Sequence, residues 1–299
     1  MAELEIVADG LRFPEGPVAM ADGSVIVVEI EAGRITRVLP DGSKRTVAEP
    51  GGGPNGLAIG PDGALYCCNN GGFVYQDHGG FLVPGGQPDD YSGGRIERID
   101  IATGAVEILY RDGDFGCVLR GPNDIVFDAH GGFYFTDHGK TRERERDRTG
   151  IFYARADGSL LKEVVFPAEN PNGVGLSPDG ATLYAAETFT CRLMAFPVLA
   201  PGQVGAGAGL YRPAGEKWFD SLGVEANGNI AVATIGESGI SVVSPTGELV
   251  EFVATPDIFT TNICWGGADR RDAYICLSGS GRLARMRWAR PGLALAHNG

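Results

Sequence analysis

Six side chains that can offer an oxygen ligand recur in the sequence at one offset from a turn. We call them the anchors. In five repeats the anchor stands eight residues before a glycine, and in the sixth the same spacing ends at an arginine. The anchors are Glu15, Asn55, Asn123, Asn172, Asp220 and Asn262. Carboxylate and amide oxygens are the ligands that hard divalent cations prefer. The spacing therefore predicts that the anchors serve one purpose in six copies of one structural unit.

The segments between the anchors indicate what that unit is. Successive anchors are 40, 68, 49, 48 and 42 residues apart, and short apolar runs alternate there with glycine-rich turns. A period in this range, built from short strands, is typical of a β-propeller. Residues 3–8 alternate polar and apolar and predict a strand that completes the last blade. We expect an all-β fold, a single six-bladed β-propeller over residues 1–299 with four-stranded antiparallel blades.

Two segments depart from the repeat. The longest interval contains an insertion at residues 70–93 that is rich in glycine. Long loops in compact folds are often functional or mobile, so we expect either a lid over one end of the ring or a disordered excursion. The tail from residue 289 is expected to fray.

The repeat also predicts where the anchors meet. All inner strands of a propeller run the same way along the central channel, so residues at one offset lie at one height. Glu15, Asn123, Asn172 and Asp220 could then share one divalent cation. Two carboxylates and two amides favour Ca²⁺, Mg²⁺ or Mn²⁺ and leave Zn²⁺ open. The alternative is that Pro-Asn-Gly tripeptides only form turns. That alternative does not require Glu15 and Asp220 to fall at the same offset.

Composition limits the partners. The formal net charge is −13, which disfavours nucleic acid and anionic membrane surfaces. We find neither a signal-peptide pattern nor an apolar run of membrane-spanning length. The six cysteines form no Cys-x-x-Cys pair and are interpreted as free thiols. We therefore expect a cytoplasmic protein, monomeric or a small homo-oligomer, that acts on a small molecule.

Four motifs surround the anchors in chain order: Phe13-Pro14-Glu15-Gly16-Pro17, Gly121-Pro122-Asn123-Asp124, Asn170-Pro171-Asn172-Gly173 and Phe219-Asp220-Ser221-Leu222-Gly223. Together they resemble the SMP-30/gluconolactonase/regucalcin-like family over essentially the whole chain. The resemblance implies a six-bladed propeller with one catalytic divalent cation, held by Glu15, Asn123, Asn172 and Asp220. It also implies hydrolysis of a lactone, most often a sugar aldonolactone. The metal would polarise the carbonyl, and Asp220 would act as the general base.

The resemblance leaves the substrate open. Enzymes similar to diisopropylfluorophosphatase hold calcium with a comparable set of residues, so a phosphotriesterase is one alternative, and a non-catalytic calcium-binding propeller is another. Many sugar lactonases carry arginine two residues before the Asn123 position, where this chain has Gly121, with Arg120 one residue earlier. Arg120 is therefore a substrate-binding candidate in a shifted place. The other candidates are Asn55, His138 and Asn262.

Overall fold

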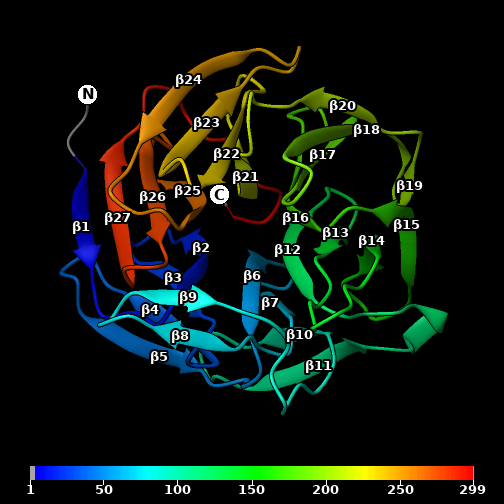
Figure 1. Ribbon diagram of the computed structural model, residues 1–299, viewed down its shortest axis with the longest axis horizontal. Coiled ribbons are helices and arrows are strands. Elements are labelled where there is room, and N and C mark those ends of the chain that lie inside the picture. Colours follow the sequence, from blue (N-terminus) through cyan, green and yellow to red (C-terminus); the bar gives the residue numbers. More distant parts are fainter. Residues whose placement is uncertain (1–3, 299) are drawn as a thin grey trace.

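The computed structural model describes residues 4–298, which form six antiparallel sheets in a ring around a central channel (Figure 1). This confirms the predicted six-bladed β-propeller. Neighbouring inner strands contact one another around the whole ring, the last against the first included, so the ring is closed. The inner strands are β2 (Pro14–Ala19), β6 (Pro54–Ile59), β12 (Pro122–Phe127), β16 (Pro171–Leu176), β21 (Trp218–Val224) and β25 (Thr260–Gly266).

The remaining strands of the first five blades follow the inner strand outward. They are β3 (Val25–Glu29), β4 (Arg34–Val38) and β5 (Lys44–Ala48) in blade one; β7 (Leu65–Asn69), β10 (Arg95–Ile99) and β11 (Val106–Arg111) in blade two; β13 (Gly132–Asp137), β14 (Thr149–Arg155) and β15 (Leu161–Ala168) in blade three; β17 (Thr182–Glu187), β18 (Arg192–Ala200), β19 (Gln203–Val204) and β20 (Ala208–Tyr211) in blade four; and β22 (Ile230–Ile235), β23 (Gly239–Val243) and β24 (Leu249–Ala254) in blade five. A short 3₁₀ turn, Asp114–Gly116, follows β11.

Burial follows this order from the channel outward. Every residue of β3 is buried, because both faces of that strand pack against neighbouring blades. Most of β24 is exposed, because it lies at the rim. The core is therefore distributed between blades. Tyr66 of blade two, for example, packs against Phe127 and Phe133 of blade three, with ring centroids 5.0 and 5.8 Å away.

The first strand of the chain completes the last blade. β1 (Glu5–Ala8) pairs with β27 (Arg282–Arg287), which follows β26 (Asp272–Leu277), and Figure 1 shows β1 beside β27. The strand predicted at residues 3–8 is confirmed as Glu5–Ala8, and residue 3 lies outside the described residues. This pairing covers an edge that β27 would otherwise expose.

The insertion at residues 70–93 is an ordered hairpin of β8 (Tyr75–Asp77) and β9 (Leu82–Pro84). It reaches three blades besides its own. The Leu82 amide donates to the Gly279 carbonyl of blade six over 2.8 Å, and the Gln87 amide to Thr141 in blade three over 2.9 Å. Asp77 pairs with Arg12 of blade one at 3.3 Å. The insertion therefore crosses the loops at the channel end where the inner strands begin.

The prediction of a frayed tail is wrong for residues 289–298. This segment enters the opposite end of the channel, and Figure 1 shows it in red inside the ring. The Leu293 amide donates to Val224 over 2.9 Å, and the Gly292 amide to Arg270 over 2.7 Å. These bonds satisfy backbone carbonyls beside the ends of β21 and β25, which gives the tail a fixed place.

Two other expectations concern the chain as a whole. Across residues 4–298, we find no helix with the length and apolar character needed to cross a bilayer. All six cysteines are free thiols, as predicted.

Candidate functional site

All six anchors occupy equivalent places, as the second or third residue of an inner strand. Five of them are at most 6% exposed, and Asp220 is half-buried. In each blade, the pairing of the inner strand with its neighbour shifts register at or beside the anchor. A shift of this kind re-aims side chains and bends the strand. The anchors therefore lie together at the end of the channel where the inner strands begin.

Glycines beside three anchors bring adjacent inner strands unusually close. A Cβ atom added at Gly16 would lie 2.3 Å from the Asn55 carbonyl oxygen. One added at Gly56 would lie 2.5 Å from the Asn123 carbonyl oxygen. Only glycine allows such an approach of one backbone to another. The glycine that follows an anchor is therefore part of what draws neighbouring anchors together.

A polar side chain at the end of the second strand holds the backbone just ahead of four anchors. Each accepts a hydrogen bond from an amide two or three residues before its anchor, which fixes how the chain enters the inner strand. These bonds run from Arg12 to Glu29 (2.8 Å), from Gly53 to Asn69 (2.9 Å), from Gly121 to Asp137 (2.8 Å) and from Glu169 to Glu187 (3.2 Å).

The carboxyl groups of the ring lie in an environment that disfavours their negative charge. Burial raises the pKa of Glu15, although the nearby Thr261 hydroxyl and the amides of Asn262 and Gly16 oppose the shift. The Asn262 amide donates to Glu15 Oε2 over 2.6 Å. Burial raises the pKa of Asp220 well above its usual value, and the nearby charge of Glu15 adds to this. A positive charge at the ring would relieve both effects.

Asp124 is a further acidic residue of the ring. Burial, followed by the charge of Glu15, raises its pKa to about 8. Its Oδ2 accepts the Val174 amide over 3.3 Å, which links blade three to blade four. The sequence contains a signal for it, since glycine occupies the same slot at Gly16, Gly56 and Gly173.

Two oxygens of the ring lack a hydrogen-bond donor. Among the described residues, no donor reaches Glu15 Oε1 or Asn123 Oδ1, although both atoms are buried. A buried acceptor without a partner costs about 1–3 kcal/mol, so such atoms need an explanation. A hard cation fits, because it binds carboxylate and amide oxygens. Within residues 4–298, no three His, Cys, Asp or Glu side chains are grouped to hold a metal. An ion here would therefore need amide ligands as well.

The substrate-binding candidates have different surroundings. Asn55 and Asn262 are buried members of the ring. The ring of His138 lies 5.7 Å from that of Phe189, and within the described part of the chain its Nδ1 has no partner. Burial lowers the pKa of His138 to about 4, and the charges of Lys140 and Arg146 assist, so this imidazole is neutral at pH 7.

Arg120 is engaged elsewhere. Its guanidinium pairs with Asp112 at 2.7 Å, beyond the end of the outermost strand of blade two. Its carbonyl accepts the hydroxyl of Tyr91 over 2.6 Å. These contacts give Arg120 a role in holding a loop, and we do not include it in the proposed substrate-binding set.

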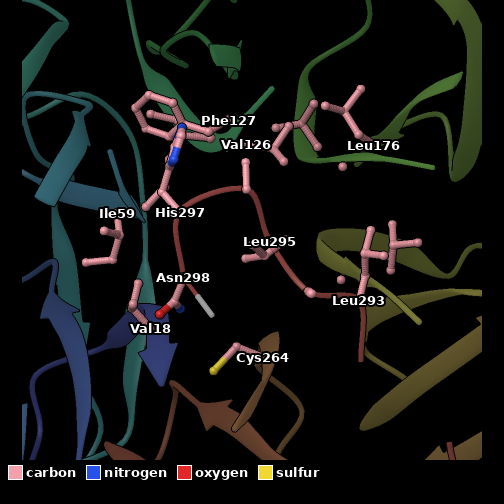
Figure 2. A pocket seen from close by; sticks show the side chains of 18 of the residues that line it. Val18, Ile59, Val126, Phe127, Leu176, Cys264, Leu293, Leu295, His297 and Asn298 are labelled. Atoms are coloured by element: carbon pink, nitrogen blue, oxygen red, sulfur yellow. The ribbon is translucent and has the colours of Figure 1, made fainter. Parts of the chain in front are cut away.

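The large cavity of the molecule lies at the other end of the channel. It measures about 850 Å³ and is lined by the later residues of the inner strands. Figure 2 shows the tail crossing it, with Leu295 inside and His297 beside Phe127, their rings 5.4 Å apart. Of the six anchors, only Asn262 lines this cavity.

Comparison with known proteins identifies relatives of the whole fold. The chain is 28% identical to a lactonase, drp35, of Staphylococcus haemolyticus over 85% of this chain and 72% of that protein. It is 23% identical to a gluconolactonase of Zymomonas mobilis over 95% of this chain and 81% of that protein.

Solved structures agree on the architecture. A gluconolactonase of Xanthomonas campestris superposes with a TM-score of 0.76 at 22% identity, covering 96% of this chain and 89% of that one. A calcium-binding regucalcin of Agrobacterium tumefaciens gives a TM-score of 0.74 at 19% identity, covering 98% and 97%. The family model described as the SMP-30/gluconolactonase/LRE-like region matches residues 13–279 of this chain. The chain therefore belongs to that family.

Proposed function

We propose that this protein is a metal-dependent lactonase that opens a sugar aldonolactone. Relatives that carry the names lactonase and gluconolactonase support the reaction class. The observation that carries the proposal is a pair of buried oxygens, Glu15 Oε1 and Asn123 Oδ1, in a ring of oxygen-bearing side chains; no donor from residues 4–298 reaches either atom.

Glu15, Asn123, Asn172 and Asp220 would hold the ion, and Ca²⁺ suits this all-oxygen set best. When bound, a divalent cation at this place polarises an ester carbonyl and stabilises the oxyanion that develops on it. The two carboxylates, Glu15 and Asp220, balance its charge of two. The amides of Asn123 and Asn172 add ligands without adding charge.

The other residues at the mouth, which is the end of the channel where the inner strands begin, would bind and orient the lactone. Asp220 accepts a proton from the attacking water, because it is the half-buried carboxylate of the ring. Asn55, Asn262 and the neutral imidazole of His138 offer hydrogen bonds to ring substituents. The insertion at residues 70–93 acts as a lid, because its hairpin crosses the loops at this end and is bonded to blades three and six.

The test combines metal analysis with turnover. The protein, freed of metal with a chelator, is assayed on a panel of aldonolactones and simple γ- and δ-lactones, before and after addition of Ca²⁺, Mg²⁺, Mn²⁺ or Zn²⁺. We expect hydrolysis that is lost on chelation and restored by one or more of these ions, with about one ion bound per chain.

Two results would contradict the proposed metal-dependent lactonase. Turnover that chelation does not change would remove the metal from the reaction. Tight binding of one ion without hydrolysis of any lactone would instead identify a non-catalytic calcium-binding propeller.

A further inference from the structure

Tyr75 is a polar residue of the mouth that lies outside the repeat. It begins β8 in the insertion, and its hydroxyl oxygen is buried without a hydrogen-bond partner in residues 4–298. Tyrosine hydroxyls that are buried usually find a partner. The neighbouring tyrosine of the insertion, Tyr91, follows that rule and donates to the Arg120 carbonyl over 2.6 Å. The hydroxyl of Tyr75 is therefore a donor with no acceptor inside the fold.

Aromatic contacts place this donor over one sector of the anchor ring. The Tyr75 ring lies 5.2 Å from that of Phe13, which in turn lies 6.0 Å from that of Phe259. Phe13 precedes the anchor Glu15 by two residues, and Phe259 precedes the anchor Asn262 by three. Tyr75 thus packs on the segment that leads into Glu15, and Phe13 connects it to the segment that leads into Asn262.

The charges around Tyr75 agree with this placement. Burial raises the pKa of Tyr75 well above its usual value, and the carboxylates of Glu31, Glu15 and Asp220 raise it further. Two of these three carboxylates are anchors. A tyrosine hydroxyl is protonated at neutral pH, so Tyr75 offers an O–H donor there.

The hairpin holds Tyr75 from both sides. Tyr75 pairs with Pro84 across the hairpin, and the next residues on β9 are bonded to blade six through the Leu82 amide. At the base of the insertion, the amino group of the buried Lys140 donates to the Gly72 carbonyl over 2.5 Å and lies 3.9 Å from the centroid of the Phe73 ring. A side chain fixed in this way can select an orientation of a bound molecule.

We propose that the Tyr75 hydroxyl donates a hydrogen bond to a hydroxyl oxygen of the bound lactone, so that Tyr75 determines specificity for hydroxylated over unsubstituted lactones. This assignment rests on the proposed lactonase function. The carbonyl of the substrate belongs at the anchors, so a donor above the ring meets another oxygen of the same molecule.

The experiment compares Tyr75→Phe with the unchanged protein on two lactones of equal ring size, D-glucono-1,5-lactone and δ-valerolactone, at saturating Ca²⁺. We expect kcat/KM to fall about ten- to hundredfold on the hydroxylated lactone and less than about threefold on the unsubstituted one. Tyr91→Phe is the matched control, because it removes a hydroxyl that bonds within the fold. It should change both lactones by the same factor.

A second measurement separates this assignment from the function on which it rests. Calorimetric titration with D-gluconate should show weaker binding by Tyr75→Phe and unchanged Ca²⁺ content. Equal losses of Tyr75→Phe on both lactones would overturn the role of Tyr75 while leaving the lactonase intact. If the unchanged protein neither hydrolyses these lactones nor binds gluconate, the function and the role of Tyr75 both fall.

Discussion

The two ends of the channel are built by the same six strands and differ in chemistry. Where the inner strands begin, they present the anchors, with two buried oxygens that lack donors among the described residues. Three or four positions after their anchors, three of these strands present Val18, Ile59 and Leu176 to a cavity of about 850 Å³. The end that holds this cavity is the less polar one.

This difference shows which structural feature marks a candidate reactive site. Binding sites are usually sought in large cavities with apolar walls. The cavity at the far end is mainly apolar, and the tail with Leu293 and Leu295 lies inside it. Buried oxygens without a donor among the described residues cost free energy, so they need an explanation, whereas apolar side chains around a cavity need none. We therefore propose the anchor end as the place of the reaction and a structural role for the tail end.

The largest expected effect comes from exchanging one carboxylate at each end. Asp220→Asn should lower kcat/KM about a thousandfold or more, because it removes both a proposed metal ligand and the proposed base. The matched control is Asp128→Asn, which alters the buried far-end acid that accepts the Tyr153 hydroxyl over 2.9 Å. It should keep activity within about threefold in steady-state assays. Similar losses in both variants would contradict the division between the two ends.

The far end should matter for stability. Leu176→Ala removes apolar contacts at the cavity wall and should lower the free energy of unfolding by about 2–3 kcal/mol, near the lower limit for such changes. Urea unfolding measures this loss. The same variant should keep kcat/KM within about threefold, and a large catalytic defect in a folded sample would indicate that the cavity takes part in the reaction.

Metal should stabilise the anchor end alone. Ca²⁺ at ten to a hundred times its dissociation constant should add about 1.4–2.7 kcal/mol to the free energy of unfolding, because it binds only the folded chain. Thermal unfolding with and without chelator gives the measurement. Glu15→Gln should lose most of this gain and Leu176→Ala should keep it. A gain that persists in Glu15→Gln would place the ion elsewhere.

The smallest effect concerns the lysine that holds the insertion. Burial lowers the pKa of Lys140 from 10.5 to about 7, although Asp137 and Asp147 oppose this. Between these values the unfolded chain binds the proton and the folded chain does not, so the free energy of unfolding rises with pH. We expect an increase on the order of 1–2 kcal/mol from pH 7.5 to 9.5.

Lys140→Met should flatten this rise, as followed by urea unfolding at both pH values. Lys162→Met, at an exposed lysine, is the control and should retain it. A slope that is the same in Lys140→Met and the unchanged protein would show that Lys140 does not cause it.

The fold and the meeting place of the anchors can be predicted from the sequence for one reason. In a structural repeat, residues at the same offset occupy equivalent places in the fold. Asn172 and Asp220 can be placed side by side without any knowledge of long-range contacts. Asp124 could have been noticed, since it breaks a run of glycines in that slot. Tyr75 could not, because the insertion has no repeat. Its place depends on contacts with Phe13 that only the folded chain reveals.

The pairing of β1 with β27 has a consequence for how the molecule can be inactivated. Glu5 is bonded to Arg285 at 2.7 Å, so the seam of the ring joins segments from opposite ends of the chain. A protease that removed the chain up to Ala8 would leave the last blade, blade six, with an open edge. Blade six supplies Asn262, and its local stability within the ring would fall. Loss of one peripheral strand would thereby disturb a cluster of oxygens on the central axis, without touching any of them.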